Sequence, residues 1–219
     1  MYKISELLDL SHTIAAPLFE GKDYPWEVLG GIREFILTLG PALSPEEFDS
    51  PEDGVWIAKD AKVFPSAYIG APCIIDHGAE VRHCAFIRGS AIVGKNCVVG
   101  NSVELKNAVL FDSVQVPHYN YVGDSVLGYK SHMGAGSITS NVKSDKTLVV
   151  VKNGPELMET GLKKFGAILG DHVEVGCNSV LNPGTVLGRE VSVYPTSSVR
   201  GVVPAGCIFK GEGNIVKRS

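Results

Sequence analysis

One histidine and two cations are the side chains whose types and spacing first suggest chemistry. His118 directly follows Pro117, and an imidazole that titrates near neutral pH can remove a proton from an attacking amine. Arg88 and Lys106 lie 18 residues apart, and an arginine fork beside a lysine charge can hold one phosphate group. From the residues alone, a structural histidine and a solvated charged face remain the alternatives.

A six-residue period must position these side chains. A large apolar residue occupies every sixth position from Ile57 to Phe111, and a small or β-branched residue follows each by four, except after the last. Such a hexapeptide forms one short face of a coil, and coils bury their apolar residues only by stacking on one another. Cys73 and Cys97 fall at small positions, so we expect both in the core.

The repeat changes phase by four residues at Pro117, and Tyr121 begins a new frame that lasts to Val199. Within this second part, residues of about 142–166 break the period, which then resumes in register. We therefore predict a loop excursion from the repeat. It is expected to contain a short strand and turn at 148–154 and a short helix or loop after them.

The start of the chain differs from the repeat. Apolar spacings of three and four after Pro25, ending before Gly40, predict an amphipathic helix. We expect a helical N-terminal arm at 1–54, a repeat domain at 55–205 and a C-terminal tail at 206–219. The arm is expected to pack on the repeat domain or on a neighbouring subunit.

Composition excludes several classes of partner. The 219 residues carry a formal net charge of −4 with a pI near 5.9, which argues against nucleic acid and against an anionic membrane surface. No apolar stretch approaches the roughly 20 residues of a membrane span, and no signal peptide is evident, so a cytoplasmic location is expected. The five cysteines include no C-x-x-C pair, which predicts reduced thiols and no structural metal.

The hexapeptides VGKNCV (93–98), LGYKSH (127–132) and VGCNSV (175–180) resemble those of the left-handed parallel β-helix family, most of whose members are acyltransferases. The resemblance implies an all-β fold, a left-handed parallel β-helix of hexapeptide repeats with a short helical N-terminal arm. It also implies three hexapeptides per coil, so that Arg88 and Lys106 stack on one face. A homotrimer with active sites between neighbouring subunits is expected.

Three longer segments, which begin at Phe86, Pro117 and Lys163, resemble the acetyltransferase domain of the bifunctional N-acetylglucosamine-1-phosphate uridylyltransferase/glucosamine-1-phosphate acetyltransferases, most closely the archaeal ones. The resemblance spans roughly residues 55–205. It implies an acetyl-CoA-dependent N-acetyltransferase of an amino sugar 1-phosphate, either glucosamine-1-phosphate or galactosamine-1-phosphate. Only Gly21 occurs in the first 29 residues, so the glycine-rich loop of the nucleotidyltransferase domain is missing and no pyrophosphorylase activity is expected.

The same resemblance assigns roles to individual residues. His118 matches the catalytic base, and Tyr121 matches a tyrosine that contacts the sugar. His132 stands where the bacterial enzymes have a sugar-binding asparagine. The phosphate-binding cations are matched by Arg88, Lys106 and Lys164, and the acetyl-CoA contacts by Ala135, Asn141 and, more weakly, Cys177. The excursion is longer than the bacterial loop and is expected to bring Lys163 and Lys164 to the cleft as a lid for a neighbouring subunit.

Two other functions remain open from the sequence. A metal-dependent carbonic anhydrase of the same fold would need three histidines that meet across an interface, and His77, His83 and His118 are available. The partner histidine expected close to His118 is missing, which argues against this reading. A non-catalytic trimeric module that binds a sugar nucleotide or acts as a scaffold would keep the fold without turnover.

Overall fold

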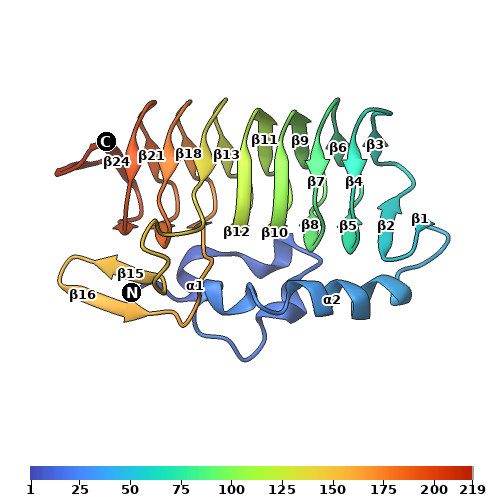
Figure 1. Ribbon diagram of the computed structural model, residues 1–219, viewed down its shortest axis with the longest axis horizontal. Helices are drawn as coiled ribbons and strands as arrows, with labels where there is room; N and C mark the ends of the chain where they lie inside the picture. Colours follow the sequence, from blue (N-terminus) through green and yellow to red (C-terminus); the bar gives the residue numbers. More distant parts are fainter. Residues whose placement is uncertain (219) are drawn as a thin grey trace.

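The six-residue period folds into coils whose residues pair in parallel with those of the next coil. In the computed structural model, which describes residues 1–218, Ile57 pairs with Ile75 and Ile75 with Val93, one coil further along each time. Figure 1 shows the resulting parallel β-helix, with the N-terminal arm along one side of it. The prediction of an all-β fold built from stacked hexapeptide coils is confirmed.

Three faces make up each coil. The first face contains β2 (Val55–Ala58), β5 (Cys73–Ile75), β8 (Ala91–Val93), β17 (Ala167–Leu169), β20 (Thr185–Leu187) and β23 (Val202–Val203). The second contains β3 (Lys62–Val63), β6 (Glu80–Val81), β9 (Val98–Asn101), β11 (Gln115–His118), β13 (His132–Met133), β18 (Glu174–Val175), β21 (Ser192–Val193) and β24 (Cys207–Gly211). The third contains β4 (Tyr68–Ile69), β7 (Phe86–Ile87), β14 (Ile138–Thr139), β19 (Val180–Leu181) and β22 (Ser198–Val199).

Two long strands, β10 (Glu104–Leu110) and β12 (Tyr121–Leu127), run from the third face onto the first. Leu105 pairs with Val122 and Leu110 with Leu127. Successive inward residues at these two corners are therefore five positions apart, whereas elsewhere in the repeat they are six positions apart. The predicted single change of phase at Pro117 is wrong, because the shift is divided between these two corners. Val122, not Tyr121, is therefore the inward residue of its coil.

The core is a continuous column of side chains inside the coils. Cys73 and Cys97 are fully buried in it, as the repeat predicted. Burial away from water raises the pKa of the Cys73 thiol to about 12, so this cysteine stays a neutral thiol.

The arm packs on the outside of the first face. It contains α1 (Ile4–Leu7), η1 (Leu10–His12), η2 (Ala16–Phe19), η3 (Pro25–Val28), α2 (Ile32–Leu39) and η4 (Gly40–Ala42). The single helix predicted after Pro25 is divided in two at Gly30 and Gly31, since two consecutive glycines weaken a helix. None of the helices in residues 1–218 is long and apolar enough to cross a membrane.

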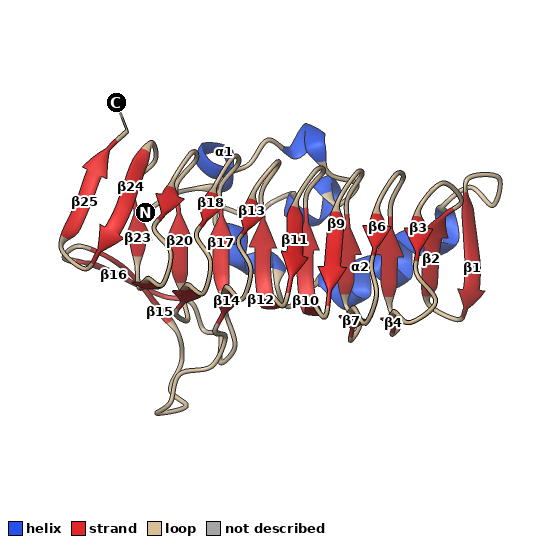
Figure 2. Ribbon diagram, turned by 90° about the horizontal axis from the view of Figure 1, so that it is seen from above, coloured by secondary structure: helices blue, strands red, loops and turns tan. Residues whose placement is uncertain are grey.

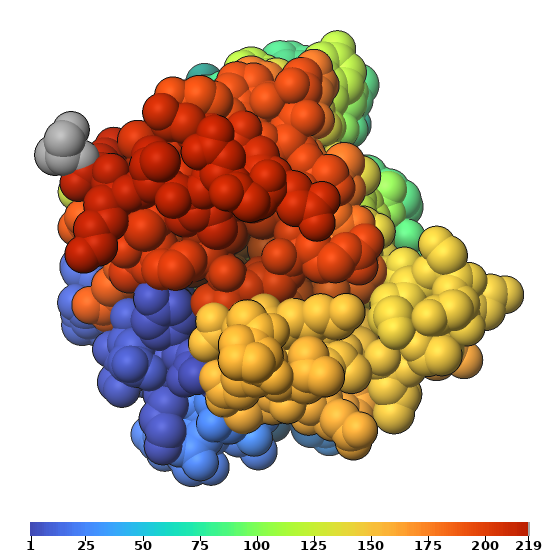
Figure 3. All heavy atoms as spheres, turned by 90° about the vertical axis from the view of Figure 1, so that its left-hand side faces the viewer, coloured from blue at the N-terminus to red at the C-terminus, as the bar shows by residue number. Residues whose placement is uncertain are grey.

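The excursion leaves the coils after β14 and returns at β17, where Leu169 pairs with Leu127. It forms a hairpin of β15 (Val150–Asn153) and β16 (Glu156–Glu159), so the helix or loop predicted after residue 154 is in part a strand. Figure 2 shows the loop before the hairpin projecting from the coils. In Figure 3 the orange hairpin lies beside the blue arm, where the Met1 amino group is 2.9 Å from Glu156 Oε2.

One antiparallel strand covers one face at each end of the helix. At the first end β1 (Phe48–Glu52) pairs with β2, so the strands begin before the arm boundary expected at residue 54. At the other end β25 (Asn214–Lys217) pairs with β24, and the segment expected as a tail contains both strands.

Candidate active site

The outer surface of the third face carries the predicted phosphate-binding cations. Ile87 pairs with Leu105, which places the next residues, Arg88 and Lys106, one above the other on adjacent coils. Arg88 Nη1 donates to Glu104 Oε1 at 2.8 Å, a diagonal contact across the two strands. This partner raises the pKa of the Arg88 guanidinium above its usual range, so the cation persists at any working pH.

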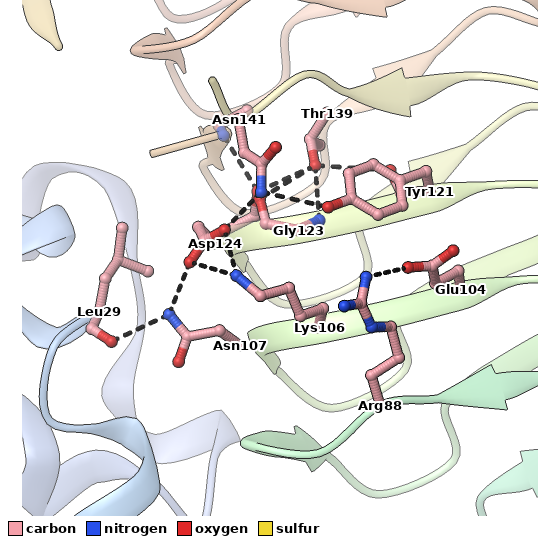
Figure 4. A network of polar contacts seen from close by, with 12 residues as sticks. Leu29, Arg88, Glu104, Lys106, Asn107, Tyr121, Gly123, Asp124, Thr139 and Asn141 are labelled. Carbon is pink, nitrogen blue, oxygen red and sulfur yellow. Dashed lines mark hydrogen bonds and ion pairs between the residues drawn. The ribbon is translucent and has the colours of Figure 1, made fainter. Parts of the chain in front are cut away.

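Asp124 is the centre of a polar network at the short corner after the third face (Figure 4). Its carboxylate lies 3.0 Å from Lys106 Nζ and accepts a hydrogen bond of 3.0 Å from Asn107 Nδ2. Asn141 Nδ2 donates to the second carboxylate oxygen. The Asp124 side chain is almost fully buried, and three donors from the two neighbouring coils compensate its loss of water.

The Tyr121 ring lies across this corner because Gly123, two residues later, has no side chain. A Cβ on Gly123 would stand 2.4 Å from the Tyr121 hydroxyl oxygen, so only glycine leaves room for the ring. Asn141 Nδ2 donates to that hydroxyl at 3.1 Å. Desolvation, aided by the nearby Asp124 charge, raises the pKa of Tyr121, which therefore remains a phenol with a proton to donate.

His118 lies at the corner where the second face ends and the third begins. Its ring is exposed, while its backbone N–H donates to Asn120 Oδ1 at 3.1 Å and its carbonyl accepts from Gly136 N at 3.0 Å. Asn120 is buried and donates in turn to the carbonyls of Gly134 and Ser137. The corner is thus fixed by atoms other than the imidazole, which is left free to meet a substrate.

Two of the residues predicted to contact acetyl-CoA lie on the same corner of the helix as His118, on the coils that follow it. Ala135 lies on the next coil, where Gly136 bonds to His118, and Cys177 follows one coil later, since Asn178 N donates to Ala135 O at 2.8 Å. Asn141, predicted with them, lies instead at the opposite edge of the third face beside Tyr121.

Two predicted residues lie apart from this network in the single chain. His132 is on the second face, where its Nδ1 is 2.8 Å from Glu174 Oε2. Lys164 is exposed and forms no ion pair within residues 1–218. It immediately precedes Phe165, whose N–H donates to Asn141 O at 3.0 Å, so this segment passes beside the network.

The sequence analysis missed four residues of the site, namely Glu104, Asn107, Asn120 and Asp124. A signal for two of them, Asn107 and Asp124, exists in the spacing: Lys106 and Asp124 are opposite charges 18 residues apart, and Asn107, Asp124 and Asn141 recur every 17 residues. Asn120 has no such signal, because its role depends on how one corner folds.

The histidines of the carbonic anhydrase alternative do not converge within this chain. His77 follows the first face, and its Nδ1 is 3.0 Å from Asp60 Oδ1. His83 and His118 follow the second face, with Asn101 on the coil between them. Across residues 1–218, no group of three or more histidine, cysteine, aspartate or glutamate side chains is arranged to hold a metal ion.

Comparison with known proteins identifies the family. The model of the GMPPB C-terminal domain matches residues 69–205. The chain belongs to the GMPPB C-terminal domain family.

The relatives of this chain include bifunctional enzymes. A bifunctional sugar-1-phosphate nucleotidylyltransferase/acetyltransferase of Sulfurisphaera tokodaii is 33% identical over 71% of this chain and 39% of its own length. A bifunctional protein GlmU of Methanococcus vannielii is 29% identical over 89% of this chain and 47% of its own length. The chain therefore spans less than half the length of either relative. The resemblance to the bifunctional uridylyltransferase/acetyltransferases, which the segments beginning at Phe86, Pro117 and Lys163 suggested, is confirmed.

Proposed function

We propose that this chain is an acetyl-CoA-dependent N-acetyltransferase that acts on an amino sugar 1-phosphate. The observation that carries the proposal is the third face, where Lys106 and Tyr121 join one network around Asp124. Arg88 lies beside Lys106 on the adjacent coil, where it pairs with Glu104. His118 stands at the opposite edge of the same face as the candidate base. The phosphate-binding cations and the proton-accepting His118 therefore lie apart, as the phosphate and the amine of the substrate do.

The cations are the proposed phosphate site. Arg88 is partly exposed, so a phosphate can replace Glu104 as its partner with two parallel hydrogen bonds. The Lys106 ammonium has three N–H donors, and its two contacts with Asp124 fix its position. One donor is left for the same phosphate. Lys164 adds a third positive charge from the excursion. Tyr121 and Asn141 are then the proposed sugar contacts.

The proposed chemistry is a single acyl transfer. The amine nitrogen of the sugar attacks the thioester carbonyl, the new N–C bond forms, and the C–S bond breaks to release the coenzyme A thiolate. His118 accepts the proton that the amine loses, and the thiolate is protonated on release. Ala135 and Cys177 follow His118 on successive coils, so we propose that acetyl-CoA lies along this corner.

We further propose that the protein works as a homotrimer. His132 and the third-face network lie on different faces, so His132 can meet the substrate only across a subunit boundary. Tyr68 and Phe86 expose 60% and 43% of their surface side by side on the third face, which supports a protein contact there. The loop of the excursion is the proposed lid for the neighbouring subunit.

The test is release of free coenzyme A thiol from acetyl-CoA, with glucosamine-1-phosphate, galactosamine-1-phosphate and glucosamine-6-phosphate supplied separately. We expect turnover with one of the 1-phosphates, which also identifies the sugar. No turnover with any of them, in a folded protein that still binds a sugar nucleotide, would favour the non-catalytic binding module. Residues 1–47 contain helices and no strand, so we propose that residues 1–218 by themselves release no pyrophosphate from UTP.

A further inference from the structure

The N-terminal arm touches the polar network through one side-chain amide. Asn107 Nδ2 donates both to the carbonyl oxygen of Leu29, at 3.0 Å, and to Asp124 Oδ1, at 3.0 Å. Asn107 lies on a short corner with a φ of +50°, a conformation that asparagine tolerates well. Figure 4 shows Leu29 on the arm and Asp124 on the coil with Asn107 between them. The arm carbonyl therefore helps to orient the amide that holds the central carboxylate.

A second contact joins the arm to the segment that carries Lys164. The Trp26 ring packs on the Phe165 ring with centroids 5.8 Å apart, and both side chains are buried. Phe165 N donates to Asn141 O at 3.0 Å, and Gly166 N donates to Asp124 O at 2.8 Å. Trp26 thus packs against the segment of Phe165 and Gly166, whose backbone bonds to Asn141 and Asp124 of the network.

We propose that the arm segment from Trp26 to Leu29 is a positioning element of the acetyl-transfer site. It fixes Asp124 through Asn107 and fixes the Lys164 segment through Phe165, without touching the substrate. This role rests on the proposed function, because it concerns the binding of the amino sugar phosphate. If the arm contributed only to stability, substitutions at any of its contacts with the coils would affect the site equally.

The chain offers a matched control for this distinction. Phe19 is an arm residue as buried as Trp26, and it packs on one coil residue, Phe111, at a similar centroid distance of 5.7 Å. Phe111 lies at the corner after the first face, away from the network. Trp26→Ala and Phe19→Ala therefore each remove one aromatic contact between the arm and the coils, and only the Trp26 contact supports the site. Trp26→Ala also removes a stacking contact with Tyr24 within the arm.

The first readout is steady-state kinetics. We expect Trp26→Ala to raise KM for the amino sugar phosphate about tenfold and to leave KM for acetyl-CoA unchanged, while Phe19→Ala changes neither. Trp26→Phe should restore most of the lost affinity, and Asn107→Gly serves as the test if the alanine variant does not fold. Asn107→Gly keeps the backbone conformation, removes the amide, and should reproduce the Trp26→Ala effect.

The second readout is independent of turnover. Amide hydrogen exchange of residues 163–167 should accelerate in Trp26→Ala and stay unchanged in Phe19→Ala. Equal effects of both substitutions on KM, or unchanged exchange in Trp26→Ala, would overturn the positioning role. If the unmodified protein shows no turnover, the proposed function fails, and the exchange experiment still decides whether the arm holds this segment.

Discussion

Lys106 and Asp124 form an ion pair of 3.0 Å between adjacent coils, with 23% and 6% of their side-chain surfaces exposed. Without the ammonium, the carboxylate would face only the amides of Asn107 and Asn141. We expect Lys106→Met to lower the free energy of unfolding by about 2–3 kcal/mol, since an unpaired buried charge is costly. Adding Asp124→Asn should recover part of this loss. Urea denaturation of the two single variants and the double variant measures it, and strictly additive costs would contradict the pairing.

His118→Asn should remove turnover while the protein stays folded. The corner is held by backbone atoms of residue 118 and by the Asn120 side chain, so the imidazole is not needed for it. Loss of a general base typically lowers kcat by about 10²–10⁴. Thiol release measures activity, and circular dichroism with size-exclusion chromatography monitors the fold. Activity near that of the unmodified protein would remove His118 from the mechanism.

Gly100→Ala should disturb the coil that precedes His118. A Cβ on Gly100 would lie 1.6 Å from the carbonyl oxygen of Pro117, so the backbone must move. We expect a loss of about 3 kcal/mol in the free energy of unfolding, together with lower activity. Gly30→Ala is the control, because a Cβ there meets no atom within 4 Å. Comparable unfolding midpoints of the two variants in urea would count against this explanation.

Stability should depend on pH through Asp76. This buried carboxyl accepts a hydrogen bond from His77 N at 2.8 Å, and its second oxygen has no partner within residues 1–218. Burial raises its pKa in the folded state, so its contribution to stability is full below the ordinary value of 3.8 and is lost as the pH rises through the folded pKa.

Asp76→Asn tests this dependence, because it keeps an acceptor for His77 and removes the charge. We expect the variant to have a higher Tm than the unmodified protein at about pH 7, with the difference fading below pH 3.8. Thermal unfolding followed across this range measures the effect. The same Tm difference at both ends of the range would show that the charge is not its cause.

The coils and the site followed from the sequence to different extents. The period of Ile57, Ile75 and Val93 sufficed for the coils, because each inward position must be apolar whatever surrounds the chain. Together with the three hexapeptides per coil that the family resemblance implied, the same period placed Arg88 over Lys106. It could not locate the network around Asp124, because two corners lose one residue each and move the polar side chains to a spacing of 17.

The arm was less predictable than the coils. An amphipathic helix indicates that one of its faces is buried, and nothing in that pattern says on which surface. The contacts of Trp26 with Phe165 and of Leu29 with Asn107 join segments far apart in the chain. Trp26 and Leu29 belong to no repeat, so only the folded structure reveals their partners.

The reversed strands at the two ends also bear on self-association. A parallel β-helix exposes open strand edges at both ends, and such edges can template the addition of further chains into a filament. Here β1 and β25 run against the direction of the coils, so another copy cannot continue the parallel register on the first face at one end or on the second face at the other. Pro51 in β1 lacks a backbone N–H, and Lys217 places a charge on β25. The reversed strands therefore oppose growth between molecules on one face at each end of the helix.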